Sequence, residues 1–268
     1  MDTQHSDQDL ITLEVTNNVA RLVFNTPQSR NALSLAMIAR LHSAILDLGR
    51  DDAVKAIVLA GQGPAFCAGH DLKEMTAARA GDDKGKEFFT KTMNNCAAMM
   101  QAIIQCPKPV IAAVDGIATA AGCQLVATCD LAVAGRSSRF ATPGVNIGLF
   151  CSTPMVAVSR NLPRKRVMEM LLMGEMIEAE TACDWGLVNR VVDDGLAFET
   201  AMDMAVIIAE KSPATVKIGK EAFYKQLDMP LDDAYAYTAQ VMVDNMLHRD
   251  AEEGINAFIE KRKPEWKG

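Results

Sequence analysis

Two short segments rich in small residues, about fifty positions apart, constrain the fold of this chain more than any other feature. Residues 64–75 and residues 116–125 each follow an apolar run and lead into a helix-forming pattern. Each is therefore predicted as the end of a strand that turns into the first turn of a helix. The first N–H groups of a helix have no partner inside it, and small residues let an oxygen atom approach the backbone closely. Two such N–H groups from separate loops would form an oxyanion hole for a thioester enolate.

The N-terminal part of the chain shows the pattern of a β-hairpin. Residues 11–15 and 19–24 flank Asn17 and Asn18, and this pair of residues favours a tight turn between two strands. The hairpin is expected at the starting edge of a sheet.

Further along the chain, the hydrophobic pattern alternates between strands and helices. A helix is expected from Leu35, capped by Asn31 or Ser34 and ended by Gly49. The charged, glycine-containing residues 78–86 are expected to be mobile, at a place where a substrate lid could lie. The other expected strands are residues 56–60, 110–114, 131–134 and 187–192. The other expected helices are residues 87–105, 165–173, 179–185, 198–209, 214–223 and 232–247, with one more that follows the second loop and ends at residue 128.

Composition narrows the possible partners. The chain has 268 residues, of which 49% are hydrophobic, so it can bury one sizeable core with a small helical appendage. The formal net charge of -7 argues against binding of nucleic acid or of an anionic membrane surface. A local basic patch near the end could meet nucleotide phosphates, or could be an ordinary solvated helix end. It consists of Lys261, Arg262, Lys263 and Lys267.

Cysteines, histidines and the N-terminal residues predict the compartment and the absence of a metal. The seven cysteines include no CxxC pair, which is typical of free thiols in a reducing compartment. The four histidines show no ligand spacing, so no metal is expected. Residues 1–9 are acidic and polar, unlike a signal or transit peptide, and no apolar run is long enough to span a membrane. From these signals we expect a cytoplasmic protein.

The sequence resembles the enoyl-CoA hydratase/isomerase (crotonase) superfamily. The similarity is carried by residues 66–75, which match the first oxyanion loop of that family, and by residues 107–116, 129–131 and 253–262. It extends over roughly residues 11 to 264. The resemblance implies an α/β fold of the ClpP/crotonase type, a spiral core of repeated ββα units with a C-terminal helical region.

The resemblance also implies a domain organisation and an assembly. Residues 1–10 would be a polar extension, residues 11–200 the spiral core and residues 201–268 a helical trimerisation region. The expected assembly is a trimer or a dimer of trimers, with no nucleic acid or membrane as partner.

By the same resemblance, an acyl-CoA thioester is the substrate, and coenzyme A enters as part of it rather than as a bound cofactor. The main-chain N–H groups of His70 and Ala121 match the two donors of the oxyanion hole. Lys73 matches a position along the bound CoA, although an ordinary solvated lysine is the alternative. The matching substrate-binding positions are Ala68, His70, Asp71, Leu72, Lys73 and Ala121, with Phe258 and Lys261 near the adenine and phosphate end, from the same or a neighbouring subunit.

The acid/base positions depart from the family pattern. Where hydratases of the family carry a pair of glutamates, this chain has Gln124 and Gly144. Each such group typically contributes about 10²–10⁴-fold to the rate, so ordinary hydration should be largely lost. Gly144 is expected to leave space for a bulkier acyl group or a carboxylate. Cys151 is a candidate replacement base, or a small packed hydrophobe, and the His70 side chain either lies beside the acyl group or is structural.

Three functions remain open from the sequence. The first is a CoA-thioester enzyme of fatty acyl-CoA metabolism with weak or altered enoyl-CoA activity. The second is a malonyl-type decarboxylase or an isomerase, because decarboxylation generates an enolate without a base. The third is an acyl-CoA binding protein that has lost turnover.

Overall fold

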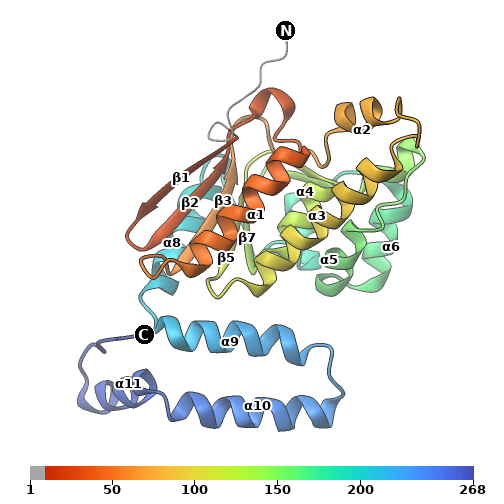
Figure 1. Ribbon diagram of the computed structural model, residues 1–268. Helices are drawn as coiled ribbons and strands as arrows, with labels where there is room; N and C mark the ends of the chain where they lie inside the picture. Colours follow the sequence, from red (N-terminus) through yellow and green to blue (C-terminus); the bar gives the residue numbers. More distant parts are fainter. Residues whose placement is uncertain (1–9) are drawn as a thin grey trace.

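The computed structural model describes residues 10–268 and consists of two β-sheets wrapped by helices (Figure 1). The predicted extension over residues 1–10 lies outside the described residues except for Leu10. No helix in the described part of the chain is long and apolar enough to cross a membrane.

The larger sheet has six strands in the order β1-β2-β3-β5-β7-β10. They are β1 (Ile11–Thr16), β2 (Val19–Phe24), β3 (Ala56–Gly61), β5 (Val110–Val114), β7 (Leu131–Gly135) and β10 (Arg190–Val192). The first two strands pair antiparallel around Asn17 and Asn18, which confirms the predicted hairpin. The other neighbouring strands of this sheet pair in parallel. Strand β5 is buried along its whole length, which is why it appears in the sequence as a continuous apolar run.

A smaller sheet lies next to the larger one and carries the loops of interest. Its strands are β4 (Ala65–Cys67), β6 (Ile117–Thr119), β8 (Arg139–Ala141) and β9 (Ile177–Glu178), in that order. Along the chain β3 is followed by β4, β5 by β6 and β7 by β8. Each pair takes the chain from the larger to the smaller sheet, which confirms the expected ββα spiral.

Some helices pack on the two faces of the larger sheet, and others pack on helices or form a separate layer. The helices are α1 (Leu35–Arg50), α2 (Leu72–Ala78), α3 (Lys86–Gln105), α4 (Ala121–Thr128), α5 (Pro154–Asn161), α6 (Arg164–Met173), α7 (Ala179–Trp185), α8 (Ala197–Ala209), α9 (Pro213–Gln226), α10 (Leu231–Met246) and α11 (Arg249–Glu260), with short 3-10 helices η1 (Pro27–Ser29) and η2 (Pro143–Ile147). On one face, α1 and α3 pack with the main core cluster. On the other face, α8 packs against Val58, Ile111 and Val133 (Figure 1).

Helix α8 can lie close to the sheet because its buried positions are all alanine. These are Ala197, Ala201, Ala205 and Ala209. Their spacing of four residues places them on one helix face. The expected domain boundary between residues 200 and 201 therefore falls inside a helix that belongs to the core.

The helices α9, α10 and α11 form a layer of their own beside the body of the molecule (Figure 1). Large apolar side chains on this layer are exposed, including Leu231, Leu247 and Phe258. The layer is joined to the core through Lys220 of α9, whose Nζ donates to the Asp130 carboxylate before β7. Tyr224 donates to the same carboxylate.

Several local expectations need correction. Helix α1 continues to Arg50 rather than ending at Gly49, where a β-carbon would lie 3.3 Å from the Pro107 ring. Ser34, not Asn31, caps this helix, because the Asn31 amide instead donates to two backbone carbonyls. Strand β10 covers only the end of the predicted strand at residues 187–192. Helix α5 was not predicted.

Candidate active site

The two small-residue loops converge, as the sequence predicts. The first runs from β4 through Gly69, which has φ of +92° and precedes His70. A β-carbon added at Gly69 would lie 2.9 Å from the Ala120 Cβ and 3.3 Å from the Ala121 nitrogen of the second loop. Glycine is thus required at position 69 by both its backbone conformation and the closeness of the second loop.

The second loop enters helix α4 through a strained residue. Ala120, the N-cap of α4, has φ 51° and ψ −118°, a conformation that glycine adopts easily and alanine rarely. Gly122 follows in the first turn, where any β-carbon would overlap the carbonyl oxygen of Cys67. The absence of a side chain at position 122 therefore lets the start of α4 rest directly on the end of β4.

The N–H groups of His70 and Ala121 lie where the loops meet, and neither makes a hydrogen bond to a backbone carbonyl of residues 10–268. The neighbouring N–H groups of Ala68, Asp71 and Ala120 donate to backbone carbonyls at 3.0, 3.2 and 2.9 Å. Among the described backbone contacts of these loops, the N–H groups of His70 and Ala121 make no such bond. Ala121 is the first residue of α4, so its N–H has no partner within the helix.

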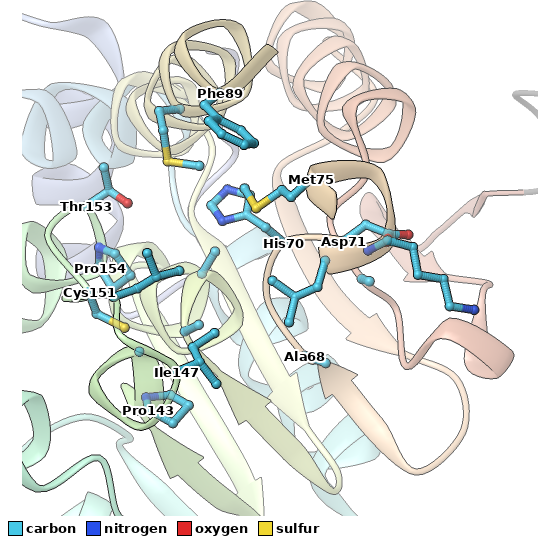
Figure 2. A pocket seen from close by; sticks show the side chains of 18 of the residues that line it. Ala68, His70, Asp71, Met75, Phe89, Pro143, Ile147, Cys151, Thr153 and Pro154 are labelled. Atoms are coloured by element: carbon cyan, nitrogen blue, oxygen red, sulfur yellow. The ribbon is translucent and has the colours of Figure 1, made fainter. Parts of the chain in front are cut away.

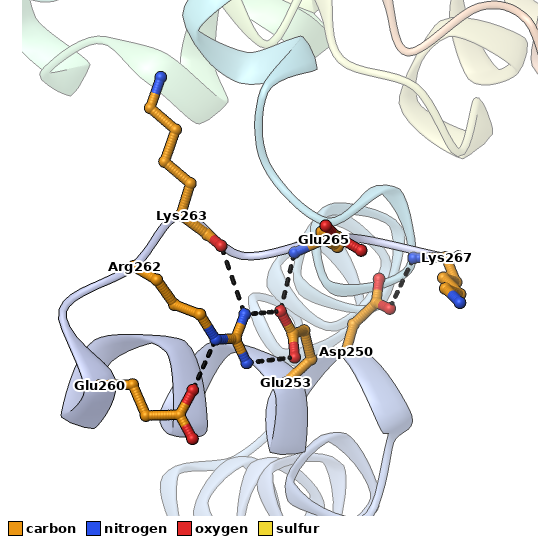
Figure 3. A network of polar contacts seen from close by, with 7 residues as sticks. All are labelled: Asp250, Glu253, Glu260, Arg262, Lys263, Glu265 and Lys267. Atoms are coloured by element: carbon orange, nitrogen blue, oxygen red, sulfur yellow. Dashed lines mark hydrogen bonds and ion pairs between the residues drawn. The ribbon is translucent and has the colours of Figure 1, made fainter.

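A cavity of about 910 Å³ opens beside these donors (Figure 2). It is bounded by α2, the start of α3, the start of α4, and the segment from η2 to α5. Figure 2 shows Met75 and Phe89 near His70, with Cys151, Thr153 and Pro154 across from it. Of the predicted site residues, the lining includes Ala68, His70, Asp71, Leu72, Lys73, Ala121 and Gly144. Gln124, Phe258 and Lys261 are not among the lining residues of this chain.

The His70 imidazole is held in its neutral form. Burial lowers its pKa to about 4, because desolvation disfavours the imidazolium. Its Nε2 is buried and has no hydrogen-bond partner in the described structure. A neutral imidazole facing a cavity can orient a ligand, yet it holds no positive charge near neutral pH.

The expected free space at Gly144 is absent. A β-carbon at Gly144 would lie 2.8 Å from the Leu149 carbonyl oxygen and 2.9 Å from Cys151 Sγ. The prediction that this position makes room for a larger acyl group or a carboxylate was therefore wrong. The loop that follows η2 folds back and occupies that volume itself.

The other predicted acid/base position is buried in the protein. Gln124 is 5% exposed on α4, and its Oε1 lacks a hydrogen-bond partner among residues 10–268. An amide cannot accept and return a proton at neutral pH. Gln124 therefore supplies no acid/base function, and its Oε1 is a buried acceptor without a partner in the described residues.

Cys151 lines the cavity and stays protonated. Burial raises the pKa of its thiol, and the hydrogen bond from the Gly144 backbone N–H only partly opposes this rise. A protonated thiol is a poor base and a poor nucleophile. The geometry thus favours the packing role over the catalytic role for Cys151.

Asp71, the carboxylate of the cavity lining, caps helix α2. Asp71 Oδ1 accepts the N–H groups of Lys73 at 2.8 Å and of Glu74 at 3.3 Å, and so caps α2. Glu74 in turn accepts the N–H of Leu35 at 3.0 Å. No cluster of three or more histidine, cysteine or acidic side chains suited to a metal occurs within residues 10–268.

Comparison with known proteins identifies the family. The sequence profile described as "Enoyl-CoA hydratase/isomerase" matches residues 14–268. This chain belongs to the enoyl-CoA hydratase/isomerase family. The rat enoyl-CoA hydratase domain-containing protein 3 is 46% identical over 261 residues, which cover 97% of this chain and 85% of the rat protein. The human protein of the same name is 48% identical over 250 residues, which cover 93% of this chain and 81% of the human one.

Solved structures of this enoyl-CoA hydratase/isomerase family have the same fold. An enoyl-CoA hydratase from Mycobacterium smegmatis is 49% identical and superposes with a TM-score of 0.91, covering 96% of this chain and 98% of that one. The human domain-containing protein 3 superposes with the same TM-score of 0.91 at 46% identity, covering 96% and 100% of the two chains. The α/β crotonase fold predicted from the sequence is confirmed.

The predicted cytoplasmic location is contradicted by the comparison. The relatives from rat, Xenopus laevis and human are named as mitochondrial proteins. The prediction relied on the polar character of residues 1–9 and on free thiols. Free thiols occur in any reducing compartment, so they do not separate the cytoplasm from a mitochondrial location.

Sequence reasoning missed part of the cavity wall. Arg79, Phe89 and Met93 line it from α2 and α3, and Phe150 lines it from the segment before α5. These residues lie in patterns that predict helix or loop but not the direction of a side chain toward a distant loop. The only sequence signal for this part of the wall was Arg79, a cation in the segment 78–86 where a substrate lid was expected.

Proposed function

We propose that this chain binds acyl-CoA thioesters in the cavity and polarises the thioester carbonyl with the N–H groups of His70 and Ala121. The observation that carries the proposal is the convergence of the two loops, which leaves these two donors unpaired beside a cavity. Donors fixed in this way stabilise the oxygen of an enolate without reorganisation during the reaction. The proposed role is a CoA-thioester enzyme of fatty acyl-CoA metabolism.

Ordinary hydration is proposed to be weak. Hydration needs groups that activate water and deliver a proton, and the lining holds one carboxylate, Asp71, which already accepts two backbone N–H groups. The thiol of Cys151 is protonated and His70 is neutral with a pKa of about 4. Each missing acid/base group removes about 10²–10⁴-fold in rate.

The CoA part of the substrate is proposed to lie along the first loop. Ala68, Leu72 and Lys73 line the cavity there, and the Lys73 ammonium can meet a phosphate. Phe258 is 85% exposed on α11 and does not line the cavity of its own chain. We therefore propose that Phe258 and Lys261 contact CoA bound to a neighbouring subunit, in a trimer or a dimer of trimers.

A second candidate function is decarboxylation of a malonyl-type thioester. In that reaction the bond to the carboxylate breaks, carbon dioxide leaves, and the electron pair moves to the thioester oxygen as an enolate. The α-carbon of the enolate then takes a proton from solvent water. No base is required, which suits a cavity whose one carboxylate caps a helix. An isomerase requires a group that moves a proton, so the same lining favours it less.

Binding and polarisation are tested together by infrared difference spectroscopy. A thioester labelled with ¹³C at the carbonyl is added to the protein, and titration calorimetry compares its affinity with that of the thioether analogue, which lacks the carbonyl oxygen. We expect the carbonyl band to move to lower frequency and the thioether to bind more weakly. An unshifted carbonyl band, or equal affinity for both ligands, would reject the oxyanion hole.

Turnover is tested by mass spectrometry with short- and medium-chain trans-2-enoyl-CoA and with malonyl-CoA and methylmalonyl-CoA. A family hydratase that carries both glutamates serves as the reference. We expect slow hydration relative to the reference. Hydration at the reference rate would contradict the proposal that the missing carboxylates matter, while binding without any product would assign a binding role.

A further inference from the structure

The charged residues of the cavity have a sign opposite to that of the chain. The net charge of the chain is -7, yet the lining contains three cations, Arg30, Lys73 and Arg79, and one carboxylate, Asp71. Asp71 is held by the two N–H groups that it caps. The cavity thus presents positive charge to a ligand.

Arg79 lies away from the two oxyanion donors. Helix α2 begins next to His70 and ends before Arg79, which is its C-cap. The backbone rises about 12 Å over the eight steps from Asp71 to Arg79, at about 1.5 Å per residue. Arg30, by contrast, is close to the first loop, because its carbonyl accepts the N–H of Ala68 at 3.0 Å.

An aromatic ring contacts the Arg79 guanidinium. Its central carbon lies 5.3 Å from the centroid of the Phe89 ring, within the range of a cation–π contact. The ring is itself fixed against Gly85, where an added β-carbon would lie 2.8 Å from a ring carbon. Arg79 is an exposed residue that lines the cavity and has the Phe89 ring on one side of its guanidinium.

Asp83, four positions after Arg79 in the sequence, forms no ion pair with it. Asp83 accepts the N–H groups of Gly85 at 2.9 Å and of Glu87 at 2.7 Å at the start of α3. Among the ion pairs of the described residues, none involves Arg79. The guanidinium keeps five N–H donors, some of which can meet a carboxylate from the ligand.

The cavity that has the oxyanion donors and Arg79 in its lining is walled mostly by apolar side chains. The residues that give it this character are Met75, Phe89, Met93, Ile147 and Phe150. Such a wall suits a run of methylene groups, whereas a guanidinium at its end suits an anion.

We propose that Arg79 forms a subsite for an anionic group at the far end of the acyl chain. The preferred ligands are then CoA thioesters of dicarboxylic acids of intermediate length, in which the second carboxylate reaches Arg79. This inference rests on the proposed function, since it takes the thioester carbonyl to lie at His70 and Ala121. Arg79 is a specificity residue in this proposal and takes no part in bond breaking.

Titration calorimetry tests the subsite with matched ligands. The probes are CoA itself, a series of dicarboxylyl-CoA thioesters from succinyl to sebacyl, and the uncharged acyl-CoA of each length. The variants are Arg79→Gln, Arg79→Lys and the control Lys91→Gln, which removes an exposed cation of α3 outside the lining. Circular dichroism verifies that each variant is folded.

Arg79→Gln is expected to weaken the binding of one dicarboxylyl-CoA by up to about fivefold, the upper value for an exposed ion pair, and to leave the binding of the uncharged ligands and of CoA unchanged. Arg79→Lys should have an intermediate effect, because it keeps the charge without the planar donor pair. Lys91→Gln should have no effect. Raising the salt concentration should reduce the wild-type preference.

Other outcomes overturn the subsite in distinguishable ways. If Arg79→Gln weakens CoA itself to the same degree, Arg79 contacts the phosphates. If Lys91→Gln weakens dicarboxylyl-CoA binding as strongly as Arg79→Gln, the loss comes from the overall positive potential of this surface and not from a contact with Arg79. If all ligands bind the wild type and Arg79→Gln alike, the subsite is rejected while the proposed function stands, whereas no acyl-CoA binding at all rejects both.

Discussion

Lys220 and Asp130, ninety positions apart in the sequence, form an ion pair with Nζ 2.6 Å from Oδ2. Both side chains are largely buried, at 7% and 15% exposure. The ammonium also donates to the carbonyls of Ile103 and Lys108, and the carboxylate accepts the Val110 N–H. This pair ties α9 to the end of α3 and to the start of two central strands.

Replacement of Lys220 by methionine is expected to lower the free energy of unfolding by about 3–5 kcal/mol, because it leaves a buried carboxylate without its partner charge. Urea denaturation measures the change. The double variant Lys220→Met with Asp130→Asn should lose less than the sum of the single variants. Additive losses would mean that the two side chains act independently.

Ala120→Gly is expected to raise the free energy of unfolding by about 1 kcal/mol, since glycine adopts φ 51° and ψ −118° without the strain that alanine carries. Thermal or urea denaturation provides the measurement. Ala121→Gly is the matched control, because residue 121 is helical, and it should be neutral or destabilising. A loss of stability in Ala120→Gly would show that the loop relieves the strain elsewhere.

Gly144→Ala is expected to destabilise the protein by about 1–3 kcal/mol, the usual cost of overpacking. Its β-carbon would meet the Leu149 carbonyl oxygen at 2.8 Å and Cys151 Sγ at 2.9 Å. Adding Cys151→Ala should restore part of the loss, because it removes the sulfur but not the carbonyl. Equal stability of Gly144→Ala and the wild type would contradict the filled volume.

The same crowding predicts that glutamates at positions 124 and 144 do not restore hydration. The double variant with Gln124→Glu and Gly144→Glu should stay near the wild-type rate in the mass-spectrometric assay. A rise of a hundredfold or more would show that the loop yields and that the carboxylate pair was the main missing element.

The His70 imidazole should make stability depend on pH. Its pKa is about 4 in the folded protein and 6.5 for the free side chain, so the unfolded chain binds more protons between these values. Stability therefore falls as the pH is lowered from about 6.5 toward about 4, and is restored above that window. Urea denaturation at several pH values compares the wild type with His70→Gln, which should show a shallower slope. Identical slopes would mean that the imidazole is not desolvated.

Local sequence determined the elements of this fold. The apolar run of β5 predicted a strand, the periodic residues of α1 predicted a helix, and the small residues around Gly69 and Ala121 predicted two strand-to-helix turns. These features depend on backbone conformation and on burial of nearby side chains, which a short segment encodes by itself. The limits of α1 and β10 were less well predicted, and at Gly49 the space for a side chain is limited by Pro107, which lies far away in the sequence.

Only the tertiary structure decided what surrounds the converging loops. Cys151 fills the volume beside Gly144, although glycine in the sequence suggested space there. Arg79, from the segment expected to be mobile, contacts the Phe89 ring of α3, and both residues line the cavity. The sequence determined which backbone groups are left without partners, because that follows from local turns and helix starts. The direction of side chains from separate elements into one cavity follows from how those elements pack, which no short segment contains.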